Sequence, residues 1–257
     1  SGPPPLLAFE GANALGAWQE LFGATYTPEP DMGRRLPGRR VEFEGPLGAV
    51  PPQTILTDFL VDRVYAVAPR QGATAVARVQ GMVAGVQRGI HTAVLTNSLA
   101  ATDVAAVHTG YARQRRALLR GGVELYEMKL KAGSDEERSR ISVTGSSRSS
   151  LHTKAMIVDR RWVFVGSMNL DPRSAFLNTE MGVLVDSPAL AEQVREQFER
   201  ATSPELSYRV VLEEGEGLVW YDRWHGQERR LEREPDASVL RRLEVTLLRL
   251  LPIDSLL

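Results

Sequence analysis

Strand-like and helix-like patterns alternate over residues 64–128, and this alternation constrains the fold more than any other feature of the chain. Three short apolar runs have the length and composition of buried strands: residues 64–68, 90–96 and 123–128. Between them, apolar residues recur at helical spacing, and each helical stretch is followed by glycine, at Gly89 and at Gly121-Gly122. The order strand, helix, strand, helix, strand predicts an α/β fold with largely parallel pairing.

The segments on either side of this region differ in character. Residues 1–53 are rich in Pro, Gly and Arg, and we expect a linker-like irregular segment that contains a short helix over 13–22. Residues 54–257 are expected to form one domain. Within it, residues 129–150 are charged and rich in Ser, which predicts a mobile loop that is either a plain linker or an active-site flap.

The last third of the chain adds a helix, a hairpin and a final helix. Ser187 and Pro188 are a typical N-cap and first-turn pair. Residues 208–212 and 218–221 are expected to form a hairpin. The final helix carries an apolar stripe: Val239, Leu240, Leu243, Leu247, Leu250 and Leu251. Such a stripe either lies at a membrane interface or packs on its own domain, and we expect the packed arrangement.

A group of polar residues carries the chemistry. His152, Lys154 and Asp159 stand in the spacing H-x-K-x4-D, and Gly166-Ser167-Met168-Asn169 and Glu180 follow. Attack on a phosphodiester needs a positive charge and neutral donors around the phosphoryl oxygens. It also needs a nucleophilic nitrogen that a carboxylate holds in one tautomer. The set supplies each of these groups.

The expected local structure brings these groups together. We expect three strands, over residues 151–158, 162–165 and 181–185, with a tight turn at 159–161. Because side chains two apart on a strand share a face, His152 and Lys154 should project together. Glu180, at the entrance of the third strand, can then hold the far nitrogen of His152.

Residues 151–186 therefore resemble the catalytic segment of the phospholipase D superfamily, whose members are called HKD phosphodiesterases after this motif. The resemblance implies a nucleophilic His152, phosphate-binding Lys154 and Asn169, the motif aspartate Asp159 and a histidine-orienting Glu180. A narrower resemblance, to the C-terminal half of bacterial cardiolipin synthases of the C type, rests on residues 95–103, 107–108, 110–111, 169–174 and 251–257. It implies a phospholipase-D-like mixed sheet flanked by helices, forming a single HKD half-domain.

Several of these residues have a structural alternative. Asp159 either contacts the catalytic groups or only shapes a turn, and Ser167 either binds phosphate or shapes the backbone. Asn97 and Ser98 follow a strand directly, where ligands gather in α/β folds, so we count them as candidate substrate residues. His108 is a further candidate. The alternative is that Thr102 or Asp103 caps a helix and that His108 packs on its flank.

Composition excludes several classes of site and partner. The net charge is −1, so the basic surplus of a protein that grips long nucleic acid is missing, and no specific nucleic acid is expected. Cysteine is absent and the four histidines are scattered, so we expect neither a metal nor another cofactor. No apolar run has the length of a membrane span, and no signal peptide is visible. The chain begins without Met, which suggests a shortened sequence.

The chain has one H-x-K-x4-D motif where the superfamily's active site joins two. The second motif is therefore expected either from another copy of the chain or from an absent N-terminal half. The resulting interpretation is a phosphatidyltransferase of the cardiolipin synthase type, which acts on phospholipid through a phosphohistidine. We expect it in bacteria, at the membrane surface on the cytoplasmic side. The alternatives are a homodimeric phosphodiesterase or nuclease, and a non-catalytic half-domain that binds lipid.

Overall fold

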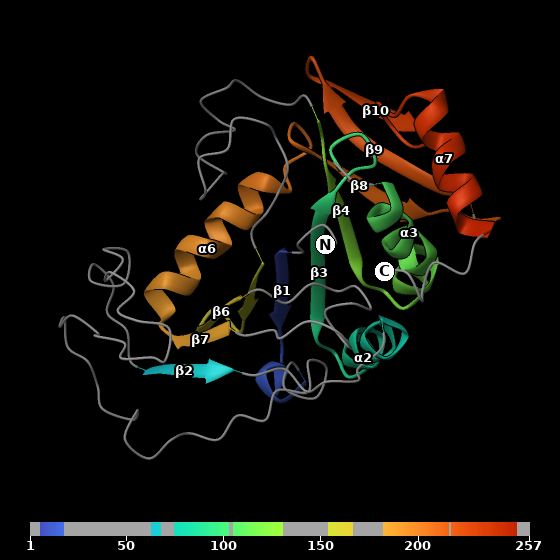
Figure 1. The fold of residues 1–257 in the computed structure, drawn as a ribbon. Helices are drawn as coiled ribbons and strands as arrows, with labels where there is room; N and C mark the ends of the chain where they lie inside the picture. The colour runs from blue at the N-terminus through green and yellow to red at the C-terminus, as the bar shows by residue number, and fades with distance from the viewer. Residues whose placement is uncertain are drawn as a thin grey trace, which may run out of the picture.

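One mixed ten-stranded sheet organises the protein (Figure 1). The computed structural model describes residues 6–17, 63–67, 75–102, 105–130, 154–166, 182–215 and 217–250. The strand order is β10-β9-β8-β4-β3-β1-β5-β6-β7-β2. The strands are β1 (Leu6–Glu10), β2 (Arg63–Val67), β3 (His91–Asn97), β4 (Glu124–Met128), β5 (Ala155–Val158), β6 (Trp162–Gly166), β7 (Gly182–Asp186), β8 (Ser207–Leu212), β9 (Leu218–Trp224) and β10 (Gln227–Leu231).

Helices cover both faces of the sheet, as Figure 1 shows. They are α2 (Ala75–Gln87), α3 (Ala105–Arg120), α6 (Pro188–Ala201) and α7 (Val239–Leu250). The α6 helix packs over β5 and β6 on one face. On the other face α2 and α3 cover β3 and β4, and α7 packs against α3. The result is a three-layer α/β arrangement in which the sheet is the middle layer.

The two faces of each central strand feed two separate cores. On β5, Met156 and Val158 join the core beneath α2 and α3. Ala155 and Ile157 join the core beneath α6, together with Phe198. This alternation follows from the period of two along a strand. All four strand residues are buried, so β5 reads in the sequence as a continuous apolar run.

The described helices begin and end close to the capping residues that the sequence predicts. Gly89 and Gly122 have φ of 86° and 82°, the left-handed conformation that glycine adopts after a helix. The Ser187 side chain accepts a hydrogen bond from the Leu190 amide at 3.2 Å, and Pro188 occupies the first turn of α6. The predicted hairpin is confirmed as β8 and β9. The predicted helix over 13–22 is described only at residues 14–17, which are helical.

The expectation of largely parallel pairing is wrong. Among the pairs that the structure describes, β3 with β4 and β1 with β5 are parallel, and the other seven are antiparallel. The β2 strand does not join β3 but pairs with β7, where Val64 faces Val185. Local patterns reveal the strands but not their partners, which come from distant parts of the chain.

The prediction of an irregular segment over 1–53 is wrong at residues 6–10. These residues form β1, which lies in the middle of the sheet between β3 and β5. Leu6 stands beside Leu95 on one side and Ala155 on the other. The strand is a short apolar run behind prolines and is paired on both sides, so it lacks the alternation that marks a half-exposed strand.

The predicted loop over residues 129–150 starts too early in the sequence, because Lys129 still belongs to the packed structure. Lys129 is buried, and its Nζ lies 2.8 Å from Asp222 Oδ2 on β9. The same ammonium donates to the carbonyl oxygens of Pro204 and Glu205 at 2.8 and 3.1 Å. Lys129 therefore anchors the end of β4 to the β8–β9 region. Residues 131–150, the rest of the predicted loop, lie outside the described residues.

The described part of the α7 apolar stripe is not packed on the domain, contrary to our expectation. The stripe residues Val239, Leu240 and Leu243 are 77%, 78% and 53% exposed. The helix is held instead through Val245, which packs with Leu99. Its polar side helps, because the Arg241 guanidinium donates to the Thr102 carbonyl oxygen. A position on the stripe therefore does not imply burial in this helix.

Candidate active site

Three backbone positions form a row at one edge of the sheet, the edge at which β5 begins. The Gly166 amide at the end of β6 donates to the Lys154 carbonyl oxygen at 3.1 Å. Gly166 also pairs with Gly182 at the start of β7. Three predicted site residues lie close in sequence to the members of this row. His152 precedes Lys154 by two positions, Ser167 follows Gly166 by one, and Glu180 precedes Gly182 by two.

Lys154 is the one predicted phosphate-binding residue that the structure describes. Its side chain is half-buried, and strand alternation puts it on the same face as Met156. Within the described ranges Lys154 has no ion-pair partner. A half-buried ammonium at the sheet edge is suited to bind an anion. His152, Asn169, Glu180 and Ser167 lie outside the described residues.

A close approach of side chain to backbone shapes this edge. The Phe164 ring is buried and lies over Gly182, where a Cβ would come within 2.3 Å of ring carbon atoms. Gly182 therefore makes room for Phe164, and the ring fixes the start of β7 against β6. This holds the strand that follows Glu180 in register with the strand that precedes Ser167.

Asn97 and Ser98 lie at the same edge, at the end of β3. Leu95, Leu6 and Ala155 stand side by side on β3, β1 and β5, so the end of β3 and the start of β5 are two strand spacings apart. That distance is roughly 10 Å. Asn97 and Ser98 therefore lie at the edge of the sheet that also carries Lys154, and their contact with substrate stays a prediction.

Ser98 also has a structural role. Its side-chain Oγ accepts from the Ala101 amide at 3.3 Å, and its carbonyl oxygen accepts from the Thr102 hydroxyl at 2.8 Å. Its own amide donates to the Met128 carbonyl oxygen at 3.1 Å. Both Asn97 and Ser98 are buried. Ser98 thus closes the turn that leads from β3 toward α3, whichever ligand this edge binds.

His108 is fully buried on the inner side of α3, which favours the packing alternative over a substrate-lining role. Its Nε2 lies 2.9 Å from an Arg115 Nη atom, and its ring meets the Tyr111 ring edge to face. The site prediction for His108 therefore finds no support in its surroundings.

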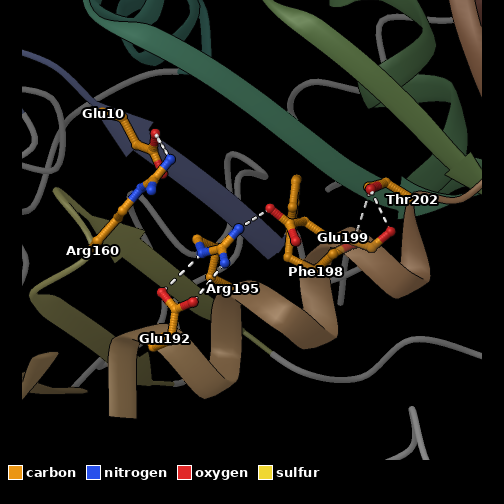
Figure 2. Close-up of polar contacts among 7 residues, drawn as sticks. All are labelled: Glu10, Arg160, Glu192, Arg195, Phe198, Glu199 and Thr202. Atoms are coloured by element: carbon orange, nitrogen blue, oxygen red, sulfur yellow. Dashed lines mark hydrogen bonds and ion pairs between the residues drawn. The ribbon is translucent and has the colours of Figure 1, made fainter. Parts of the chain in front are cut away.

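Asp159 occupies the turn that joins β5 to β6, at the end of β5 opposite to Lys154. Its φ is 52°, and its Oδ1 accepts from the Gly11 amide at 3.0 Å. It lies five residue steps of extended chain from Lys154, a distance of roughly 16 Å. Next to it, Arg160 pairs with Glu10 at 3.1 Å (Figure 2). The geometry favours the turn-shaping role of Asp159 and ties this turn to the end of β1.

Figure 2 also shows what stabilises α6 above the same region. Arg195 bonds to Glu192 with Nε–Oε2 of 2.9 Å and forms a second ion pair with Glu199. Thr202 donates to the Phe198 carbonyl oxygen at 2.9 Å at the end of the helix. These contacts are i to i+3 and i to i+4 pairs on a helix surface, and none of them involves the edge where Lys154 lies.

Sequence reasoning missed a buried charged cluster next to α3. Arg115 is fully buried, with Nε 3.1 Å from Glu127 Oε1 and an Nη atom 2.9 Å from Glu234 Oε1. Glu127 also accepts from the Trp220 indole at 2.9 Å and from the Tyr111 hydroxyl at 3.1 Å. The available signal was the spacing of Arg115 with Tyr111 on the apolar face of a helix, where an arginine needs a buried partner.

The pKa values of the two carboxylates in this cluster are shifted in opposite directions. Burial raises the pKa of Glu127, and the neighbouring Glu234 raises it further, although Arg115 acts in the opposite direction. Burial also acts to raise the pKa of Glu234, but Arg115 and His108 outweigh it and lower that pKa to about 2. Glu234 is therefore the firm counter-ion of Arg115. The cluster rigidifies the fold beside the site.

Other candidate sites are scarce in the described ranges. A cavity of about 640 Å³ lies between α3, α7 and the β8–β9 hairpin, lined by four arginines and four glutamates. It contains none of the predicted site residues. The described ranges hold no group of three or more His, Cys, Asp or Glu residues arranged to bind a metal ion. Nor does any helix within them have the length and hydropathy needed to cross a membrane.

The chain matches a family of known proteins. Residues 64–202 match the family described as "Cardiolipin synthase, PLD-like domain", and this span covers more than half of the chain. The chain belongs to this phospholipase-D-like family. The five predicted catalytic residues, from His152 to Glu180, all lie inside the matched span.

Related proteins extend the match. The chain is 42% identical to cardiolipin synthase C of Escherichia coli (strain K12) over 172 residues, which are 67% of this chain and 36% of that protein. It is 28% identical to cardiolipin synthase B of Salmonella typhi over 97 residues, 38% of this chain and 19% of the relative. The chain thus spans about a third or less of the length of these bacterial relatives.

Two solved structures are similar at low identity. Nuc from Salmonella typhimurium, a phospholipase D family member, has a TM-score of 0.38 and 14% identity, over 77% of this chain and 93% of Nuc. Phosphatidylserine synthase of Haemophilus influenzae Rd KW20 has a TM-score of 0.38 and 12% identity, over 73% of this chain and 39% of the synthase.

Proposed function

We propose that the chain is one half of a phosphatidyltransferase of the cardiolipin synthase type. The observation that carries the proposal is the row of Lys154, Gly166 and Gly182, from which the segments with His152, Asn169 and Glu180 depart. The 42% identity to cardiolipin synthase C supports the choice of reaction. The net charge of −1 argues against the nuclease alternative, which requires a basic groove.

In this mechanism His152 attacks the phosphorus of a phospholipid. A P–N bond forms as the P–O bond to the leaving alcohol breaks, and the alkoxide takes a proton from an acid of the second motif. Lys154 and Asn169 stabilise the charge on the phosphoryl oxygens. Glu180 holds the far nitrogen of His152, and Ser167 adds a donor to phosphate. An acceptor hydroxyl then attacks the phosphohistidine, loses its proton to the second motif, and releases His152.

The second motif comes from an N-terminal half that precedes this one in a longer protein. The length of the relatives supports this choice over pairing of two copies, since the chain covers only 36% of cardiolipin synthase C. The partners of the complete enzyme are a phospholipid and the membrane surface, on the cytoplasmic side. No metal is required, because Lys154 provides the positive charge that a cation would otherwise bring.

A phosphoenzyme trap tests the proposal. The chain, joined to or mixed with the matching N-terminal half, is incubated with a phospholipid labelled in its phosphate and quenched with acid-free denaturant. Label should stay on the protein, survive excess chelator and disappear in His152→Ala. Label that persists in His152→Ala would refute the proposed nucleophile, and loss of labelling by the chelator with rescue by a divalent ion would refute the metal-free site.

A further inference from the structure

The β9–β10 hairpin presents an exposed tryptophan at the edge of the sheet that carries Lys154. Asn97 at the end of β3 stands beside Met128 on β4, and Met128 stands beside Ser207 at the start of β8. The β9 strand runs antiparallel to β8 and therefore ends at the same edge, at Trp224. Figure 1 shows the hairpin on the side of the molecule toward which the arrow of β3 points.

Trp224 is held in place although its side chain is 43% exposed. The Arg229 guanidinium lies over the indole, 5.0 Å from the ring centroid. Arg229 is itself fixed, because it donates twice to the buried Asp222 carboxylate, at 2.9 and 2.6 Å. Asp222 is paired in turn with the buried Lys129, which directly follows β4. The indole is therefore preorganised for contact, and little side-chain entropy is lost when a partner covers it.

The turn of the hairpin fixes the direction in which this side chain points. His225 and Gly226 form a two-residue loop with φ of 49° and 76°, and positive φ at both positions is typical of tight hairpin loops. The exposed His225 ring meets the Trp224 ring edge to face, with the centroids 5.0 Å apart. We call Trp224, His225 and Arg229 the hairpin platform.

We propose that the hairpin platform is a docking anchor for the N-terminal half of the enzyme, the half that carries the second motif. This inference rests on the proposed function, which puts that half against the edge that carries Lys154. In sheet order β9, β8, β4, β3, β1 and β5 follow one another, so β9 is five strand spacings from β5, roughly 24 Å. A compact half of about 200 residues is roughly 40 Å across. A half whose motif faces Lys154 therefore also reaches the hairpin.

The surroundings of the platform fit a protein partner. Tryptophan and arginine are the side chains that most often carry the binding energy of protein interfaces, where a polar rim encloses them. Here Arg223 lies 3.2 Å from Glu205 and 3.8 Å from Glu228, so the exposed charges around the indole are balanced. A surface for anionic lipid or for nucleic acid needs a basic surplus instead.

Hydroxyl-radical footprinting of the isolated chain and of the complete two-half enzyme tests the inference. Oxidation of Trp224 and His225 should be about tenfold slower in the complete enzyme, because the partner shields a central anchor from water. His91, whose side chain is 56% exposed at the opposite edge of the sheet, should react equally in both proteins.

Variants of the complete enzyme identify the anchor. Trp224→Ser should raise the oxidation of His225 nearly to its rate in the isolated chain, since the platform loses its largest contact. His91→Ser is the matched control, because it removes an exposed ring from the opposite edge and should leave His225 protected. Thermal unfolding confirms that each variant is folded.

The outcomes separate docking from catalysis. Equal oxidation of Trp224 in the two proteins, or a protected His225 in Trp224→Ser, would overturn the inference. So would protection of Trp224 in the isolated chain at rising concentration, or on addition of phosphatidylethanolamine and phosphatidylglycerol vesicles, because a second copy or a bilayer would then be the occupant. His152→Ala should give the wild-type footprint, so a missing phosphohistidine would refute the proposed function and leave the docking result standing.

Discussion

Lys154 stands where the sequence analysis placed a phosphate-binding charge, half-buried at the start of β5. A donor that binds the charge developing on the phosphoryl group contributes roughly 3 kcal/mol to the transition state. We therefore expect Lys154→Ala to lower kcat/KM of the complete enzyme on the order of a hundredfold. The exposed Arg160, near the opposite end of β5, provides the control variant Arg160→Ala. Equal losses in the two variants would contradict a phosphate-binding role for Lys154.

Arg115 is a second residue whose replacement has a defined cost. Its loss leaves Glu127 fully buried without a positive partner, and breaking a buried pair from one side typically costs about 3–5 kcal/mol. Arg115→Met should therefore lower the free energy of unfolding by that amount in urea denaturation. Arg233→Met, at an exposed position, should stay within about 0.5 kcal/mol of wild type. A stable Arg115→Met protein would show that the cluster is dispensable.

The same cluster predicts a dependence of stability on pH. The pKa of Glu234 falls from 4.5 to about 2 on folding, so the unfolded chain binds more protons between these values. The stabilisation from Glu234 is therefore complete above about pH 4.5 and is lost as the pH falls toward 2. Unfolding measured across this range should show a shallower acid loss in Glu234→Gln than in wild type. Glu214→Gln, at an exposed position, should keep the wild-type slope.

Single residues were partly predictable from sequence. Lys154 was singled out because its spacing from His152 and Asp159 is a chemical pattern, and its role in phosphate binding stays a prediction. The buried partners Glu127 and Asp222 were not, because a charge within an apolar strand gives no hint of which distant cation will face it. For His108 the sequence left a substrate role and packing on the helix flank both open, because its burial depends on the packing of Arg115 against it.

Among the elements, the start of β7 depends on one glycine. A methyl group on Gly182 would lie 2.3 Å from the Phe164 ring, so Gly182→Ala must displace a buried aromatic side chain. Overpacking of this kind costs about 1–3 kcal/mol, which exceeds the gain from lower backbone entropy. We expect Gly182→Ala to lower the unfolding free energy accordingly. It should also reduce activity, because the register of β6 with β7 shifts at the sheet edge that carries Lys154.

Gly110 offers the opposite control within the same chain. It lies in α3, where an added methyl group would meet no atom within 4 Å, and glycine weakens a helix by roughly 0.5–1 kcal/mol relative to alanine. Gly110→Ala should therefore stabilise the protein slightly. The two substitutions are chemically identical, so shifts of opposite sign in the unfolding midpoint would assign the Gly182 effect to Phe164. Destabilisation by both would leave that assignment without support.

Elements that are marked by neighbouring residues in the sequence were predicted, and elements that depend on pairing with distant strands were not. Ser187 and Pro188 predict the start of α6, and three polar residues between apolar runs predict the β5–β6 turn. The β1 strand was missed, since its place in the sheet depends on pairing with β3 and with β5, more than eighty residues away in either case. The apolar stripe of α7 was recognised, but its direction was not, because packing through Val245 and Leu99 decides it.

At the scale of the whole molecule, the chain holds one of the two motifs that the proposed reaction needs. A histidine bonded to phosphorus cannot also donate a proton to the leaving alcohol in the same step. The isolated chain should therefore be nearly inactive at low concentration. Adding the N-terminal half that the longer relatives imply should raise the transfer rate in a saturable manner.

Titration with an inactive copy distinguishes the source of the second motif. If two copies pair about a twofold axis, both supply the same surface and both His152 side chains face one cleft. Mixing His152→Ala with wild type would then remove more active sites than dilution alone, because a pair of one variant and one wild-type chain is inactive. If the N-terminal half supplies the acid, His152→Ala acts only as a competitor for that half, and excess N-terminal half restores the full rate. We expect the second result. A strictly monomeric chain with full transfer activity would contradict both arrangements, since a single motif would then suffice.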